Sequence, residues 1–86
     1  MGQLSGRVAL VTGSTSGIGL GIACALAAEG ADVAMNGFGT DAAITEACQA
    51  VEAFGGRITL SRANVREPDE VRQMVADAIA TFGKID

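Results

Sequence analysis

Apolar residues along the chain occur in two alternating patterns, short continuous runs and longer stretches with helical spacing. The continuous runs follow glycine in GRVALV, GADVAM, GRITL and GKI, where the glycines stand at positions 6, 30, 56 and 83. Parallel strands that are buried on both faces read as continuous apolar runs of this kind. Each interval between the glycines has room for one strand, one helix and two short loops. The pattern therefore predicts a βαβαβα chain whose fourth strand is only beginning at the last glycine.

The three stretches between these runs place apolar residues at the three- and four-residue spacing of a helix. We expect each apolar stripe to pack on the sheet, because amphipathic helices bury that side. The stripes are Ile18, Ile22 and Leu26; Ile44, Cys48 and Val51; and Val71, Met74, Val75, Ala78, Ile79 and Phe82.

Local signals mark where these helices begin and end. Pro68 and the two acidic residues after it suit the first turn of the third helix. Gly30, Gly56 and Gly83 stand where a helix should end, and glycine tolerates the left-handed conformation found there. The chain thus alternates strands and helices, which predicts an α/β fold with a parallel sheet.

Right-handed crossovers limit the topology of such a chain. In the doubly wound (Rossmann) arrangement the strands lie in the order 3-2-1, and a fourth strand returns beside the first. The first two helices then cover one face of the sheet and the third covers the other. Residues 1–86 are therefore predicted to be the N-terminal part of such a sheet, truncated before the fourth strand, so that the first strand is an open edge.

Composition excludes several classes of partner. The six Lys and Arg residues are scattered and the net charge is −4, so we do not expect nucleic acid binding. The longest apolar stretch, residues 18–28, is far shorter than the roughly 20 residues that span a bilayer, so no membrane contact is expected. Cys24 and Cys48 lie in helical patterns and are interpreted as buried small hydrophobes, which favours a reducing, cytoplasmic compartment. No metal site is predicted.

The segment TGSTSGIG, residues 12–19, joins the first strand to the first helix and contains more glycine than a corner needs. Close approach of a ligand would explain Gly13 and Gly17, and close packing of helix on strand would explain Gly19. The first turn of a helix offers free backbone N–H groups and partial positive charge to a pyrophosphate. A phosphate site is therefore favoured over a plain turn, and a P-loop is excluded because no Lys follows the glycines. The hydroxyls of residues 14–16 would donate to the phosphate or cap the helix.

The spacing T-G-x-x-x-G-I-G resembles the fingerprint of the short-chain dehydrogenase/reductase family. The resemblance extends from LSGRVALVTG to the final GKID. It implies that residues 1–86 are a partial NAD(P)-binding Rossmann domain. The cofactor contacts expected in the glycine turn are Gly13, Thr15, Ser16, Gly17, Ile18 and Gly19.

The family also implies hydride transfer between a nicotinamide and a secondary alcohol or ketone. Its acid–base residue is a Tyr, supported by Lys, Ser and Asn, in segments that follow an N-N-A-G motif. The chain contains no Tyr and ends before that motif. No catalytic residue is therefore assigned, and we expect the isolated 86 residues to bind NAD weakly or not at all.

The end of the second strand, AMNGFG, lacks the acid that usually accepts from the ribose 2′-hydroxyl of NAD. NADP is less favoured still, because no Arg or Lys lies in the glycine turn or within residues 31–53. Asn36 and the backbone of Gly37 are interpreted as holding the ribose hydroxyls. Phe38 is interpreted as lying against the adenine, with a core aromatic as the alternative.

The third strand leads into RANVRE, where family members often place an Asp and a small apolar residue against the adenine. Asn64 and Val65 occupy these positions, and the Asn side chain can also accept from an amino group. The alternative is that Asn64 only shapes the turn before the third helix.

The string NGFG after VTGSTSGIGLGIA is similar to the bacterial D-3-hydroxybutyrate dehydrogenases, an NAD-dependent group within the family. This resemblance implies NAD as cofactor, a small hydroxy acid or ketone as substrate, and a homotetrameric parent enzyme. A non-catalytic nucleotide-sensing or interaction module with the same fold is the alternative function.

Overall fold

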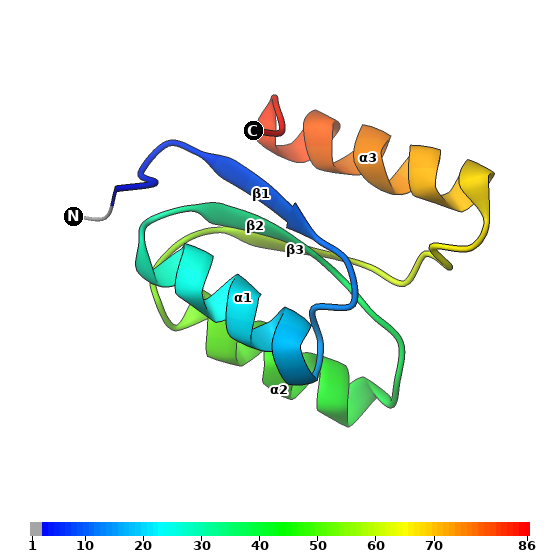
Figure 1. Ribbon diagram of the computed structural model, residues 1–86, viewed down its shortest axis with the longest axis horizontal. Coiled ribbons are helices and arrows are strands. Elements are labelled where there is room, and N and C mark those ends of the chain that lie inside the picture. The colour runs from blue at the N-terminus through cyan, green and yellow to red at the C-terminus, as the bar shows by residue number, and fades with distance from the viewer. Residues whose placement is uncertain (1–2) are drawn as a thin grey trace.

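The computed structural model describes residues 3–86 and contains three strands and three helices in strict alternation. In chain order they are β1 (Val8–Val11), α1 (Gly17–Ala28), β2 (Asp32–Asn36), α2 (Asp41–Glu52), β3 (Ile58–Ser61) and α3 (Pro68–Phe82) (Figure 1). The α/β class and the βαβαβα alternation are confirmed.

The three strands form one parallel sheet in the order β1-β2-β3, with β2 paired to both neighbours. Read from the opposite edge, this order is 3-2-1. Val8 lies opposite Asp32, and Val33 lies opposite Ile58. In Figure 1, α1 and α2 lie together on one face of the sheet and α3 lies on the other, as right-handed crossovers require.

The chain after α3 returns to the free edge of β1. Gly83 ends the helix in the left-handed conformation, with φ of 86°. The backbone N–H of Asp86 donates to the carbonyl of Val8 at 2.8 Å, and the N–H of Val8 donates to the Asp86 carboxylate at 2.8 Å. The last described residue therefore lies where a fourth strand would begin in the doubly wound order.

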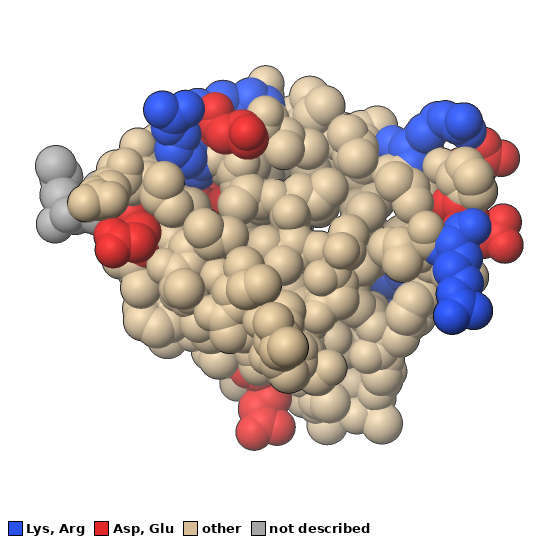
Figure 2. Space-filling model, viewed as in Figure 1, with Lys and Arg blue, Asp and Glu red and all other residues tan. Residues whose placement is uncertain are grey.

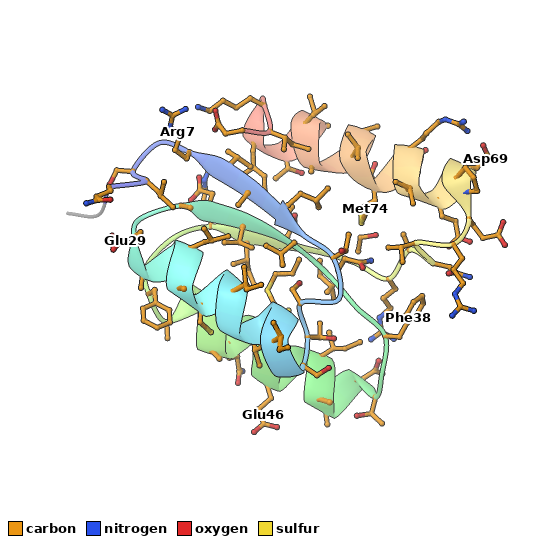
Figure 3. The ribbon with its side chains drawn as sticks, viewed as in Figure 1. Arg7, Glu29, Phe38, Glu46, Asp69 and Met74 are labelled. Atoms are coloured by element: carbon orange, nitrogen blue, oxygen red, sulfur yellow. The ribbon has the colours of Figure 1, made fainter. Side chains whose placement is uncertain are left out.

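The core lies between the sheet and the pair α1–α2. Its buried residues are Ala23, Ala27, Val33, Met35, Ala47 and Val51. Val33–Asn36 of β2 are all buried, whereas most residues of β1 and β3 are only partly covered. Among the described strands, nearly complete burial is thus confirmed for β2 alone, the central strand whose two edges are both paired. On the opposite face, the side chain of Met74 points from α3 toward the sheet (Figure 3).

The prediction for the buried face of α1 is wrong for Ile18 and Ile22, whereas Leu26 is half-buried and packs against the core. Ile18 is 85% exposed and Ile22 is 48% exposed, whereas Ala23 and Ala27 are buried. Gly19 stands one turn before Ala23, so the most deeply buried row of α1 consists of small residues, with Leu20, Cys24 and Leu26 partly buried against the core. Small residues let the helix lie close to the structure beneath it, which the bulkier isoleucines would prevent. In α2 the predicted stripe is confirmed for Ile44 and Val51, and Cys48 is half-buried.

The predicted helix boundaries agree with the structure, apart from one glycine. Pro68 is the first residue of α3, and Gly30 adopts a positive φ of 97° after α1. At the end of α2, however, Gly55 takes the left-handed conformation instead of Gly56. Gly56 is needed for space, since a Cβ there would lie 2.8 Å from the carbonyl oxygen of Ala31.

Charged side chains gather mostly toward two ends of the face in Figure 2, with other residues between them. Both cysteines are free and half-buried, and burial raises the pKa of the Cys48 thiol.

Within residues 3–86, no helix has the length and apolar character needed to cross a membrane.

Candidate cofactor site

The glycine turn between β1 and α1 contains two glycines that combine special backbone geometry with open space. Gly13 has φ of 60° and Gly17 has φ of 55°, a region that other residues rarely adopt. A Cβ built on either residue would meet no atom within 4 Å. Nothing in the turn therefore occupies the space beside them, and a ligand can approach the backbone there.

Gly19 serves packing. A Cβ at this position would lie 2.0 Å from the carbonyl oxygen of Gly13, which is far inside van der Waals contact. The first turn of α1 thus rests directly on the glycine turn. The predicted close packing at Gly19 is observed, although the contact is with the turn and not with the strand.

The N-terminus of α1 lacks the usual partners of a helix start. Ser16 is the N-cap residue in an extended conformation, and no side chain accepts a hydrogen bond from the first turn. That turn also contains no acidic residue, whereas Asp41 stands in the first turn of α2 and Asp69 and Glu70 in that of α3. The partial positive charge at the start of α1 is therefore not offset by the helix itself.

Asn36, predicted to hold ribose hydroxyls, is 2% exposed and uses its amide inside the fold. Its Oδ1 accepts from the N–H of Gly13 at 3.2 Å, and its Nδ2 donates to the carbonyls of Ser61 and Ala63 at 3.2 and 3.0 Å. Asn36 therefore joins the ends of all three strands, and its buried amide is bonded to the backbone within the fold.

Ser14 adds further hydrogen bonds between the glycine turn and the end of β2. Its buried hydroxyl accepts from the N–H of Asn36 at 2.9 Å, and its backbone N–H donates to the Asn36 carbonyl. The hydroxyl is therefore directed to β2 and neither caps α1 nor faces open space.

Thr15 joins the glycine turn to the loop after β2. Its hydroxyl is 3.5 Å from the carbonyl oxygen of Phe38, and a Cβ on Gly37 would lie 2.0 Å from the same hydroxyl. The absence of a side chain at Gly37 thus makes room for Thr15. Phe38 is 61% exposed and lies on this loop (Figure 3), so the core alternative for its ring is wrong.

Asn64 and Val65 lie on the loop after β3. The Oδ1 of Asn64 accepts from the N–H of Arg66 at 3.0 Å, and the N–H of Asn64 donates to the Glu70 carboxylate at 3.0 Å. These contacts favour the turn-shaping role of Asn64. Val65 is 48% exposed and offers an apolar surface beside it.

One charged contact at this edge is not apparent from the sequence. Arg62 directly follows β3, and its guanidinium donates to the carboxylate of Asp41 at the start of α2. The two residues are 21 positions apart, and the pair forms because the ends of β2 and β3 are neighbours. In the sequence, the only signal of this contact is a positively charged residue soon after the third apolar run.

The carboxyl ends of the three strands therefore bring together the glycine turn, the loop with Phe38 and the loop with Val65. The open space at Gly13 and Gly17 and the uncapped start of α1 fit the diphosphate of a dinucleotide. Exposed apolar side chains at the other two loops fit the flat face of its adenine. Within residues 3–86, no group of three His, Cys, Asp or Glu side chains is arranged to hold a metal ion.

Comparison with known proteins agrees with this arrangement. A family model described as short chain dehydrogenase matches residues 7–86. The chain is 50% identical over 85 residues to a D-beta-hydroxybutyrate dehydrogenase of Cupriavidus necator, which covers 98% of the chain and 32% of that protein. It is 38% identical over 86 residues to an L-rhamnose 1-dehydrogenase (NAD(P)(+)) of a Sphingomonas species, covering the whole chain and 34% of that protein.

Among solved structures, a short chain dehydrogenase from Mycobacterium paratuberculosis bound to NAD superposes with a TM-score of 0.91 at 32% identity. The match covers 99% of the chain and 36% of that protein. The chain thus spans about a third of the length of the relatives it matches.

Proposed function

The chain belongs to the short-chain dehydrogenase family, and we propose that it is the N-terminal, cofactor-binding part of an NAD-dependent oxidoreductase. In this proposal residues 1–86 are a partial Rossmann domain, and a fourth strand continues from Asp86 along β1. One observation carries the assignment. The first turn of α1 has no side-chain cap hydrogen bond and no acid, and both its first residue, Gly17, and Gly13 in the preceding turn have open space beside them.

We propose that the diphosphate is held by backbone amides at Gly17, Ile18 and Gly19. Gly13 gives it access, and Ser16 is exposed beside it. These donors are fixed before binding, so little reorganisation is needed when the anion arrives. The bound nicotinamide supplies or accepts the hydride, and the residues of this chain hold and orient the dinucleotide.

At the adenosine end the proposed contacts are the ring of Phe38 and the side chain of Val65. Both side chains are exposed on loops that follow neighbouring strands, so each offers apolar surface to a flat base. Thr15 and Asn64 support these loops through their hydrogen bonds. Asn36 is assigned the same supporting role, because its buried amide bonds the backbone at Gly13, Ser61 and Ala63.

For the substrate we propose a secondary alcohol, with 3-hydroxybutyrate and acetoacetate as the reacting pair. This is supported by the 50% identity with one D-beta-hydroxybutyrate dehydrogenase and by the NGFG loop. The proton carrier would be supplied outside these 86 residues, which contain no Tyr. The proposal includes a cytoplasmic, homotetrameric parent, supported by the two free cysteines and by family resemblance.

The test uses the product of the complete reading frame that encodes these residues. We expect calorimetric titration to show NAD binding, and D-3-hydroxybutyrate to drive formation of NADH. Failure to bind any nicotinamide dinucleotide would refute the cofactor assignment. Binding of NAD without turnover of any secondary alcohol would instead favour a nucleotide-sensing module.

A further inference from the structure

The ion pair between Arg62 and Asp41 stands at the adenosine end of the proposed site. Arg62 is 51% exposed and extends from the end of β3, while Asp41 is 90% exposed at the start of α2. Together they connect the two loops that follow β2 and β3. The loop with Phe38 ends at Asp41, so the pair borders the place proposed for the adenine and its ribose.

The chemistry at this place distinguishes the two nicotinamide dinucleotides. NAD carries a hydroxyl at the ribose 2′-position and NADP carries a phosphate. An arginine can bind a phosphate through two parallel hydrogen bonds, whereas a carboxylate repels it. Residues 33–40 contain no acid, and the amide of Asn36 is buried and bonded within the fold. Asp41 and Arg62 are thus the charged groups that border this loop and contact each other.

We propose that the Asp41–Arg62 pair sets the choice between NAD and NADP. This inference rests on the proposed dinucleotide-binding function. While Asp41 holds the guanidinium, Arg62 is neutralised and the carboxylate disfavours a 2′-phosphate. When Asp41 is uncharged, Arg62 is free to bind the phosphate. Both effects act in the same direction, so the pair holds a latent NADP site in an NAD-preferring state.

The two partners are expected to respond in opposite ways. Asp41→Asn should increase the affinity for NADP by about tenfold or more, as gain of one charge-assisted contact implies. Arg62→Gln should weaken NADP binding by about the same factor. The affinity for NAD should stay within about twofold in both variants, because its 2′-hydroxyl carries no charge.

The experiment is calorimetric titration of the full-length protein with NAD and NADP at one fixed ionic strength. The probes 5′-AMP and adenosine 2′,5′-bisphosphate then test the adenosine end alone, without any contribution from nicotinamide. Two control variants change the same charges elsewhere. Arg66→Gln removes a cation from the same loop, and Glu52→Gln removes an acid from the far end of α2.

Thermal unfolding should be almost unchanged in these variants, because exposed ion pairs contribute little to stability. An unchanged ratio of NADP to NAD affinity in Asp41→Asn would overturn the inference, as would an equal shift in either control variant. If the unaltered protein binds neither dinucleotide, the proposed function itself fails. Normal NAD binding with an unshifted ratio refutes only the role of the ion pair.

Discussion

The two ends of the parallel sheet are built in opposite ways. At the amino ends of the strands, Asp32 accepts from the backbone N–H of Arg57 at 2.8 Å and pairs with its guanidinium at 3.0 Å. That guanidinium also lies 5.2 Å from the centre of the Phe82 ring. At the carboxyl ends, the first turn of α1 has no such partner. At the amino end the Asp32 carboxylate is thus engaged by Arg57, whereas at the carboxyl end the start of α1 leaves backbone donors for an external anion.

Glycines stand in both confined and open positions at each end of the sheet, and Gly37 at the carboxyl end is confined by Thr15. At the amino end, a Cβ on Gly30 would lie 2.7 Å from the hydroxyl of Ser5, and Gly56 is confined by Ala31. At the carboxyl end, Gly13 and Gly17 have empty space around the missing side chain. Gly6 and Gly55 at the amino end are open as well, so what distinguishes Gly13 and Gly17 is their place beside the first turn of α1, which has no side-chain cap.

The largest expected effect is a difference in the free energy of unfolding between alanine variants of two glycines in α1. Gly19→Ala would place a methyl group against the Gly13 carbonyl and should lower the free energy of unfolding by about 3 kcal/mol. Gly21→Ala meets open space and should raise it by up to about 1 kcal/mol. Urea unfolding measures both, and equal shifts in the two variants would disprove the close packing at Gly19.

The next effect concerns the two asparagines predicted to contact the adenosine. Asn36→Ala removes the amide that joins three strand ends and should lower the free energy of unfolding by about 2–3 kcal/mol. Asn64→Ala removes one partly exposed turn contact and should cost about 1 kcal/mol or less. A smaller loss for Asn36→Ala than for Asn64→Ala, measured by thermal unfolding, would contradict the supporting role of Asn36.

A third test compares glycines at the two ends of the sheet. Gly17→Ala and Gly55→Ala both force alanine into a left-handed conformation in open space, which costs about 1–2 kcal/mol of stability. Only Gly17 lies at the proposed diphosphate site. We therefore expect Gly17→Ala to weaken NAD binding about tenfold and Gly55→Ala to leave it unchanged. Calorimetry on the full-length protein decides, and equal binding by both variants argues against the site.

The smallest effect is the response to acid at the edge of β1. The N–H of Val8, and then Lys84, hold the pKa of the Asp86 carboxyl below its ordinary value. The ionised form therefore stabilises the fold fully above about pH 4, and this contribution is lost as the pH falls through the folded pKa. Asp86→Asn should flatten the dependence of the urea midpoint on pH in that range. A slope equal to that of the unaltered protein would exclude this contribution.

Much of the fold could be predicted from the sequence because its signals are local. Pro68, the glycines at helix ends and the continuous apolar runs each act on their own segment. The inner face of α1 could not be predicted in the same way. The helix carries two rows with the same four-residue spacing, one that starts at Ile18 and one of small residues that starts at Gly19. The row of small residues is the more deeply buried one, because the helix lies so close to the glycine turn.

In the candidate site, too, the features that depend on one continuous segment could be predicted, and those that depend on contacts between segments could not. The glycine turn is contiguous, so Gly13, Gly17 and Gly19 could be assigned before the structure was known. The roles of Asn36 and Arg62 depend on which strand ends become neighbours, and an amide side chain suits a ligand and a backbone equally well. Residue type alone therefore placed Asn36 at the carboxyl edge of the sheet but did not predict its bonds to the backbone at Gly13, Ser61 and Ala63.

The three contacts of the Asn36 amide have a consequence for dynamics. A single side chain bonds the backbone after β1 and after β3 while sitting at the end of β2. Restricting the motion of Gly13 therefore also restricts Ser61 and Ala63, although no bound molecule need touch them. Hydrogen–deuterium exchange should thus slow at residues 63–66 when inorganic pyrophosphate or NAD occupies the start of α1, and Asn36→Ala should abolish that distant protection.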